Sequence, residues 1–474
     1  MEKYMGNKSK FCSSIFNEID KVFPIKKGYT LFDPFTGTTN VSRFFKEKGI
    51  NIICNDINDF SFVLGKTYIE NCEFPQFEKL RLELKKSFKM FGSEEFSFKK
   101  KQLIKENGNT TDINKLNCNN AEPYLEVLTY LTYYANESGY PSTHNLFFDY
   151  YCENGLHSRY VNLVHQKTLI GIRNKSKDKV TVELINSFLE PPFDEKLIVE
   201  LHEHLKNTGE TVIYDKISKI LLKGNLVGNR MFFSEKHGKR LDVIFNTVCH
   251  WKNIGLINEQ EYYILIASLI ETVTIFSNTS ATYQAFYKDY RMNTMQDFRM
   301  VIPDIDTTKI KAKVLKTDAY KLIPEVNADI IYLDPPYNWR QYDSNYHLLN
   351  TIAKYNDLDN KEEFLENIIG ASGENRAQKL EYTSFNCKST FETLLLEQLV
   401  KVKCRCVALS YSDSESNHKR EDIEKTIQQL EAFFGNKEIF SRYEVIKLKS
   451  RNFESRKGNT REDINELLFI AIKN

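Results

Sequence analysis

The hydrophobic pattern opens with two short apolar runs on either side of one helical pattern. Residues 28–32 (GYTLF) are apolar, β-branched or aromatic and lead into Asp33-Pro34. Residues 40–48 then have helical spacing and Gly49 supplies a stop, after which residues 50–54 (INIIC) form a second apolar run. This order of strand, turn, helix and strand predicts a βαβ unit and therefore a parallel sheet.

A long stretch of different character follows and then strand-like runs return. Residues 71–300 show helical spacing at 195–207, 240–252 and 262–276, without strand–helix alternation. Apolar strand patterns return at 313–315, 330–333 and 406–411, and a closing hairpin is expected from 443–448 and 467–472. We therefore predict an α/β fold whose sheet is interrupted by a mainly helical insert. The expected division is a catalytic domain of residues 1–70 and 301–474 around an insert of residues 71–300.

Composition narrows the class of protein without naming a partner. The 474 residues include 65 Lys and Arg against 64 Asp and Glu, so any basic surface must be local. Nine cysteines without framework spacing and a start lacking a signal-peptide pattern lead us to expect a reducing cytoplasm. The most apolar segment, residues 262–276, contains Glu271 and is short for a membrane span, so we expect a buried helix and no membrane anchor.

Candidate chemistry begins at Asp334-Pro335-Pro336-Tyr337, which directly follows the apolar run IIYL. Ligands of such sheets sit outside the carboxyl ends of the strands. A carboxylate, a backbone carbonyl and an aromatic face together suit a planar heterocycle with an exocyclic amine. Two acceptors that hold the amine hydrogens localise its lone pair and favour attack on an electrophilic methyl group. A Pro-Pro turn that merely ends a strand is the alternative at this point.

The loop after the first predicted strand is a second candidate. Residues 33–39 read DPFTGTT, and Gly37 allows close approach of a ligand to the backbone before a helix begins. Asp56 ends the second predicted strand, where an acid can grip ribose hydroxyls. Alone, this loop is also compatible with a well-capped turn.

Together these motifs resemble the Dam-like, alpha-class family of DNA adenine methyltransferases found in restriction–modification systems. The matching set, in the same order as in the family, is Gly6-Asn7-Lys8, DPFTGT, Asp56, Thr317-Asp318-Ala319 and DPPY. The resemblance implies a Rossmann-like S-adenosylmethionine (SAM)-dependent methyltransferase sheet, a target-recognition insert and methyl transfer to a flipped adenine in double-stranded DNA. It implies SAM as cofactor and no metal, with a restriction endonuclease as a candidate partner. The implied cofactor-binding residues are Lys8, Asp33, Phe35, Gly37, Asp56 and Asp318, and the implied catalytic residues are Asp334, Pro335, Pro336 and Tyr337.

One position departs from the family pattern. The family usually reads DPFxGxG, and Thr39 stands where the second glycine is expected. A β-branched residue narrows the loop and does not readily take a positive φ. We therefore expect either an adjusted turn or weaker cofactor binding.

Other methyltransferase classes are compared by their signatures. No proline is followed by cysteine, which excludes a carbon-5 cytosine methyltransferase. Cytosine-amino enzymes usually carry Ser where this chain has Asp334, and RNA or ribosomal enzymes commonly carry Asn there. A non-catalytic DNA-binding subunit is a further alternative. His202-Glu203-His204 does not predict a metal site, because residues two apart on a helix diverge.

Two local basic clusters are candidate phosphate contacts, with a solvated surface as the alternative. They lie within residues 167–179 and 442–461. The candidate DNA-binding residues are Lys167, Arg173, Lys175, Lys177, Lys179, Arg340, Lys449, Arg451, Arg456 and Lys457.

Overall fold

A computed structural model describes most of the chain. The described residues are 8–108, 116, 119–136, 145–280, 282–335, 342–375, 391–412, 420–451 and 463–474. Only the backbone is described at residues 342–343, 391–394, 412, 420–422, 449–451 and 463–465.

A seven-stranded, mostly parallel sheet organises the fold, in the order β10-β11-β9-β6-β1-β2-β5. All neighbouring pairs are parallel except those made by β11, which runs antiparallel to β9 and to β10. The predicted strands and the closing hairpin are all present, so the prediction of a mixed α/β fold is confirmed. The strands are β1 (Thr30–Asp33), β2 (Asn51–Asn55), β5 (Ala312–Leu315), β6 (Ile330–Leu333), β9 (Cys406–Ser412), β10 (Phe440–Arg451) and β11 (Asp463–Lys473).

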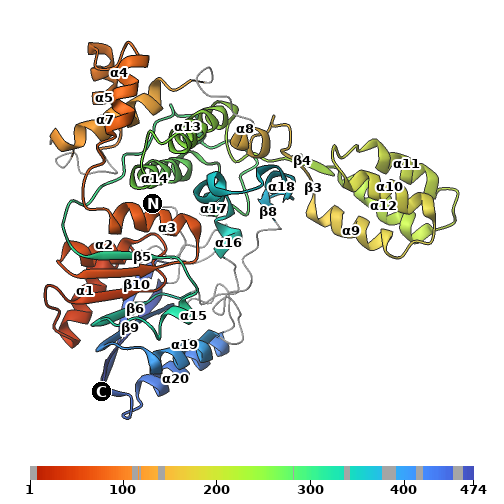
Figure 1. Ribbon diagram of the computed structural model, residues 1–474. Helices are drawn as coiled ribbons and strands as arrows, with labels where there is room; N and C mark the ends of the chain where they lie inside the picture. The colour runs from red at the N-terminus through yellow and green to blue at the C-terminus, as the bar shows by residue number, and fades with distance from the viewer. Residues whose placement is uncertain are drawn as a thin grey trace.

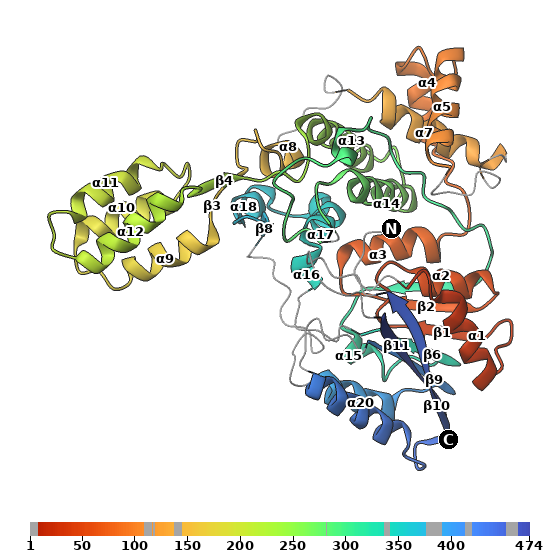
Figure 2. The same ribbon diagram turned by 180° about the vertical axis from the view of Figure 1, so that it is seen from behind.

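Helices cover both faces of this sheet (Figures 1 and 2). Alternate strand residues point to opposite faces, so Leu31 packs with α1 and α2 while its neighbour Phe32 packs with α19 and α20. Burial on both faces explains why the strands read as continuous apolar runs. The helices are α1 (Cys12–Val22) and α2 (Asn40–Glu47) on one face, and α15 (Ala319–Leu322), α19 (Phe391–Lys401) and α20 (Arg420–Phe434) on the other.

A second apolar core holds a body of helices beside the sheet. Its central helix α14 (Glu259–Phe276) is buried over most of its length, as predicted, and Glu271 accepts a hydrogen bond from Tyr68 Oη at 2.7 Å. Among the described residues, no helix combines the length and apolarity that crossing a membrane requires. The other helices here are α3 (Asp59–Gly65), a π-helix (Lys66–Glu70), α4 (Glu78–Ser87), α5 (Glu94–Glu106), α7 (Glu122–Tyr133), α8 (Leu146–Tyr151), α13 (Glu235–Asn253), α16 (Tyr342–Asn345), α17 (His347–Lys354) and α18 (Lys361–Glu366).

A helical arm, residues 159–229, projects from this body (Figures 1 and 2). An antiparallel ribbon of β3 (Arg159–Val161) and β4 (Val227–Asn229) joins it to the body. The arm has an apolar core of its own, so it is a local folding unit. Its helices are α9 (Leu163–Arg173), α10 (Lys179–Leu189), α11 (Lys196–Leu205) and α12 (Thr211–Lys223). The remaining short elements are β7 (Ile368–Ile369), β8 (Glu374–Asn375) and 3-10 helices at Asn119–Ala121, Met292–Met295 and Tyr355–Asp357.

Candidate active site

Four acidic residues singled out from the sequence lie at one edge of the sheet. Asp33 ends β1, Asp56 follows β2, Asp318 follows β5 and Asp334 follows β6. These strands are neighbours and parallel, so their carboxyl ends share one edge. The chain moves outward from β1 through β2 to β5 and then returns to β6 on the other side of β1. Asp33 and Asp334 therefore flank the topological switch point, where ligands of such sheets bind.

Asp33 is a buried carboxyl group with one unused oxygen. Its Oδ2 accepts a hydrogen bond from Ser42 Oγ on α2 at 2.7 Å, while Oδ1 is buried without a hydrogen-bond partner. Burial raises the pKa of Asp33 to about 7. The Ser42 hydrogen bond lowers this pKa, whereas the Asp334 charge raises it further. A cationic group brought to this oxygen would favour the ionised form.

The loop after β1 is fastened to Asp56. Gly37 has a φ of 49°, and its N–H donates to Asp56 Oδ2 at 2.8 Å. The other oxygen, Oδ1, accepts from the backbone N–H and from Nδ2 of Asn58, both at 2.9 Å. Burial raises the pKa of Asp56 although these hydrogen bonds favour the carboxylate. The Asp56 side chain is therefore fixed at the end of β2.

Thr39 takes the left-handed conformation that a glycine would take. Its φ is 65° and its ψ is 4°, and its N–H donates to the carbonyl oxygen of Thr36 at 2.7 Å. The turn does not adjust to avoid a positive φ, because its hydrogen bond and the fully buried side chain hold Thr39 there. Such a conformation costs about 1–2 kcal/mol. The other expected outcome, weaker cofactor binding, stays a prediction. The buried Thr39 hydroxyl has no hydrogen-bond partner.

Two asparagines that the sequence analysis missed tie the loops together. Asn55 Nδ2 donates to the carbonyl oxygens of Pro34 at 3.1 Å and Thr317 at 3.0 Å, and Asn55 Oδ1 accepts from the Thr317 N–H at 3.0 Å. Asn350 Nδ2 on α17 donates to Asn58 Oδ1 at 3.2 Å. No local sequence signal marks either residue, because each contact joins segments far apart in the chain.

Asp318 starts a helix at the same edge. Its Oδ1 accepts from the Tyr320 N–H at 3.0 Å, which makes it the N-cap of α15. Because Asn55 holds the preceding residue, Thr317, the Asp318 loop is fastened to the end of β2. Asp318 therefore lies one strand away from Asp56 at the sheet edge.

Asp334 is part of a buried ion cluster. Lys8 Nζ lies 3.2 Å from Asp334 Oδ1 and 2.7 Å from Glu466 Oε1. The Asp334 side chain is 19% exposed, whereas those of Lys8 and Glu466 are 5% and 7% exposed. Burial raises the pKa of Asp334 to about 6; the Lys8 ammonium opposes this and the Glu466 carboxylate adds to it. The cofactor role expected of Lys8 stays a prediction, and Glu466 was missed by the sequence analysis.

The remaining predicted site residues differ in how far the structure describes them. Pro335 follows Asp334 and is buried, and Phe35 is half-buried in the loop after β1. Pro336, Tyr337, Arg340, Arg456 and Lys457 lie outside the described residues, and Lys449 and Arg451 are described only as backbone of β10.

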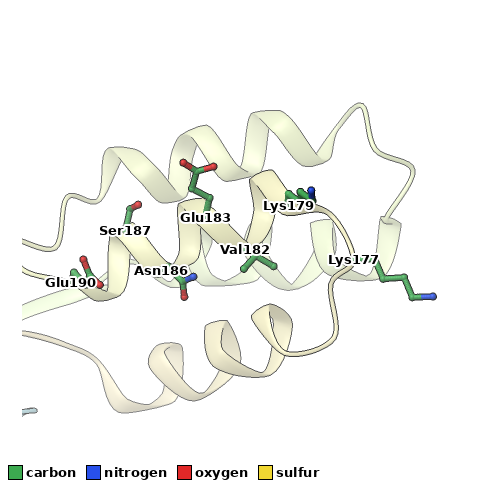
Figure 3. Close-up of a pocket in the computed structure, with 7 residues that line it drawn as sticks. All are labelled: Lys177, Lys179, Val182, Glu183, Asn186, Ser187 and Glu190. Atoms are coloured by element: carbon green, nitrogen blue, oxygen red, sulfur yellow. The ribbon is translucent and has the colours of Figure 1, made fainter.

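The first basic cluster lies on the arm, where α9 leads into α10. Lys167, Lys175, Lys177 and Lys179 are exposed and Arg173 is half-buried. A hollow of about 430 Å³ along α10 is lined by Lys177 and Lys179 but also by Glu183 and Glu190, with the two glutamates balancing the charge (Figure 3). Lys177 points away from α10 in this view. The exposed lysines, rather than the hollow, are therefore the candidate phosphate contacts.

The two histidines of α11 diverge, as expected. His202 Nε2 lies 2.8 Å from Ser218 Oγ on α12, and His204 Nε2 lies 2.7 Å from Asp178 Oδ2 at the start of α10. Both are half-buried against neighbouring helices. Within the described residues, no group of three His, Cys, Asp or Glu side chains could hold a metal ion.

Comparisons with known proteins agree with this arrangement. A family model described as D12 class N6 adenine-specific DNA methyltransferase matches residues 4–195 and 189–406. These matches cover most of the chain, so the protein belongs to this family, as the sequence motifs indicated.

Individual relatives match only parts of the chain. The type II methyltransferase M.FokI of Planomicrobium okeanokoites is 34% identical over 245 residues, which are 52% of this chain and 35% of that protein. The type II methyltransferase M.NlaIII of Neisseria lactamica is 30% identical over 233 residues, 49% of this chain and 63% of the relative. M.CviAII of Paramecium bursaria Chlorella virus 1 is 29% identical over 292 residues, 61% of this chain and 79% of the relative. The chain thus spans less than two thirds of the first two relatives.

Proposed function

We propose that this protein is a site-specific DNA adenine methyltransferase that transfers a methyl group from SAM to the exocyclic amino group of a flipped adenine in double-stranded DNA. The observation that carries the proposal is the position of Asp334. It follows β6 at the switch point of the sheet, within the ion cluster and at the same sheet edge as three further acids, in a member of an adenine methyltransferase family.

The residues at the sheet edge fit the cofactor that the family implies. Asp33 Oδ1 and Thr39 Oγ1 are buried without partners, so the loop after β1 offers polar groups that a ligand can satisfy. Lys8, Asp33, Phe35 and Gly37 would hold the methionine part, and Asp56 the ribose. Asp318 would contact the adenine ring. Bound SAM would supply an electrophilic methyl group.

Asp334 would act on the target amine. Within the part of the chain that the structure describes, Lys8 is paired with Oδ1, and Oδ2 would be the oxygen that accepts an N–H of the flipped adenine. The Pro335-Pro336 segment would supply a carbonyl acceptor, and Tyr337 would stack on the base. The base is inside the duplex and must be extruded to reach the site. Methyl transfer would then be direct and in line, and positioning of the amine would be the main contribution of the protein.

The fold supports a division into a catalytic domain and a recognition insert. β2 and β5 are adjacent parallel strands, yet the chain between them forms the arm and most of the helical body. The helices α16, α17 and α18, which follow β6, complete that body. We infer a Rossmann-like methyltransferase sheet made by residues 1–70 and 301–474, with target recognition in residues 71–300. Exposed lysines of the arm would contact phosphates. The cytoplasmic location and a restriction endonuclease partner stay predictions.

The test is methyl transfer by the purified chain. Methyl-labelled SAM would be supplied with double-stranded DNA, single-stranded DNA or structured RNA, and the product digested to nucleosides. We expect N6-methyladenine in double-stranded DNA, and sequencing of methylated genomic DNA should give one short recognition sequence. N4-methylcytosine, or labelled RNA with unlabelled DNA, would instead support the cytosine-amino or RNA alternative. SAM binding without any transfer would favour the non-catalytic alternative.

A further inference from the structure

We propose that Glu466 is a positioning residue for methyl transfer, which holds the Lys8 ammonium against Asp334 and limits how strongly that ammonium neutralises the catalytic carboxylate. This inference rests on the proposed function. It assigns a role to a strand residue that lies 458 positions from its partner in the chain.

The sheet topology brings Glu466 to the site. β11 is antiparallel to β9, so it begins where β9 and β6 end. Glu466 pairs in register with Ser412, the last residue of β9, and is therefore at the edge that carries Asp334. An acidic residue at this position of the antiparallel strand can reach the catalytic edge without belonging to a catalytic loop.

Lys8 is placed by the start of α1. Its carbonyl oxygen accepts the N–H groups of Phe11 at 2.8 Å and Cys12 at 3.1 Å, so its backbone is part of the start of that helix. α1 in turn packs on the sheet through apolar side chains. The start of α1 thus holds the Lys8 backbone, and the Lys8 ammonium lies between Glu466 and Asp334.

Among the described residues, the charges of the cluster do not balance. One ammonium faces two carboxylates, and it lies 0.5 Å nearer to Glu466 (2.7 Å) than to Asp334 (3.2 Å). Glu466 therefore interacts more closely with the Lys8 ammonium than Asp334 does. Asp334 thus keeps enough negative charge to be a strong hydrogen-bond acceptor. Without Glu466, Lys8 would pair with Asp334 alone, and the carboxylate would be a weaker acceptor for the target amine.

Other titratable groups near Asp334 come from its own strand and from the adjacent β1. Asp33 at the end of β1 and Tyr332 on β6 both interact electrostatically with Asp334. Glu466 raises the pKa of Asp334 and Lys8 lowers it. Asp33 and Tyr332 are unchanged in a Glu466 variant, so a shift in the titration of Asp334 reports on the Lys8–Glu466 pair.

Glu466→Gln tests the role with the least change of shape. The amide oxygen still accepts from Lys8, but the negative charge is gone. At saturating SAM and DNA, we expect kcat to fall about tenfold and its acid limb to move to lower pH, because Asp334 loses a repelling neighbour. The KM for DNA should change by less than about twofold. Glu466→Asp, which restores the charge, should return the acid limb toward the wild-type position.

A control variant and a double-mutant cycle separate this positioning role from a purely structural one. Glu444→Gln, on β10 of the same hairpin and ion-paired with Arg442 at the surface, should leave kcat and its pH profile unchanged. Lys8→Met and Glu466→Gln should combine non-additively in kcat, because Glu466 acts through Lys8. Carbon-13 NMR of aspartate carboxyls, with Asp334→Asn for assignment, should show the same lowered pKa without turnover.

Two results would overturn the inference. One is a Glu466→Gln protein with wild-type kcat and wild-type acid limb, and the other is a loss of kcat that multiplies independently with Lys8→Met. Both results count against the inference when the wild-type protein methylates DNA. A wild type that methylates no adenine would instead contradict the proposed function.

Discussion

Buried carboxyl groups determine the chemistry of the individual side chains at the sheet edge. Asp33, Asp56 and Asp334 are all removed from bulk solvent, and burial raises the pKa of each. Hydrogen bonds from Ser42, Gly37 and Asn58, and the Lys8 ammonium, work in the opposite direction. The pKa values of Asp33, about 7, and of Asp334, about 6, therefore lie close to neutral pH.

Methyl transfer should be lost on the acid side of neutrality. Asp334 is a strong acceptor for the target amine only when it is ionised, and its pKa is raised to about 6 from the ordinary 3.8. At saturating SAM and DNA, kcat should thus fall as pH falls through about 6. A stopped methyl-transfer assay across a constant-ionic-strength buffer series measures this. A kcat that is flat down to about pH 4.5, the range of an ordinary carboxyl group, would contradict the assignment.

The unpartnered Thr39 hydroxyl should matter for cofactor affinity. Thr39→Val keeps the shape but removes the hydroxyl, whereas Thr39→Ser keeps the hydroxyl. We expect Thr39→Val to weaken SAM binding about fivefold, as loss of one hydrogen bond would, and Thr39→Ser to bind within about twofold of wild type. Calorimetry without DNA measures both. Equal affinities of the two variants would show that the hydroxyl does not face the cofactor.

The sequence predicted the acids at the sheet edge together with Lys8 and Gly37, which contact two of them. It did not predict the contacts made by Ser42, Asn58 and Glu466. Asp33, Asp56, Asp318 and Asp334 each end or follow an apolar run, and the ends of parallel strands necessarily meet. Glu466 belongs to an antiparallel strand and had no such signal. The conformation of Thr39 was also missed, since local preference alone disfavours a positive φ that the surrounding turn and packing enforce.

Strands and helices with strong apolar patterns were predicted well. β1, β2, β6 and β9 are buried on both faces, so each appears as a short apolar run between turn residues. α11, α13 and α14 correspond to the predicted helical patterns within a few residues. The pairing of β3 with β4 was not predicted, because the ribbon closes only after a whole helical bundle has intervened.

Asn55 should link the strand ends to cofactor binding. Asn55→Ala removes three hydrogen bonds that fasten the loops after β1 and β5 and leaves buried backbone groups unpaired. We expect the free energy of unfolding to fall by about 2 kcal/mol and SAM affinity to fall at least about tenfold. Denaturant unfolding and calorimetry measure these effects.

Asn51→Ala is the matched control on the same strand. Asn51 Nδ2 also donates to a backbone carbonyl, that of Gly28 at 2.8 Å, but at the opposite end of β2. This variant should bind SAM like the wild type. An Asn55→Ala protein whose SAM affinity matches that of Asn51→Ala would show that the loops keep their geometry without the Asn55 amide.

The arm offers a basic surface remote from the sheet edge, in a chain whose total charge is nearly neutral. Exposed Lys175, Lys177 and Lys179 would contact phosphates and so position the duplex without selecting its sequence. Replacing all three by Gln should weaken binding to specific and unrelated DNA alike. The slope of log affinity against log salt should become shallower by about two to three, while the methylated sequence stays the same.

A triple variant of α12 controls for charge. Lys216, Lys219 and Lys223 are exposed on the same arm, and their replacement by Gln removes the same three charges. This control variant should keep most of the wild-type slope of log affinity against log salt. Equal losses in both variants would indicate a diffuse attraction to the arm, and a changed methylated sequence would place base recognition at these lysines.

The account as a whole depends on Asp334 being the acceptor for the target amine at the switch point of the sheet. The most direct measurement compares Asp334→Asn with wild type in SAM affinity, by calorimetry, and in single-turnover methyl transfer to double-stranded DNA. We expect SAM affinity within about threefold of wild type and a transfer rate lowered by about two orders of magnitude or more. A variant that transfers methyl groups at the wild-type rate with saturating SAM would contradict it.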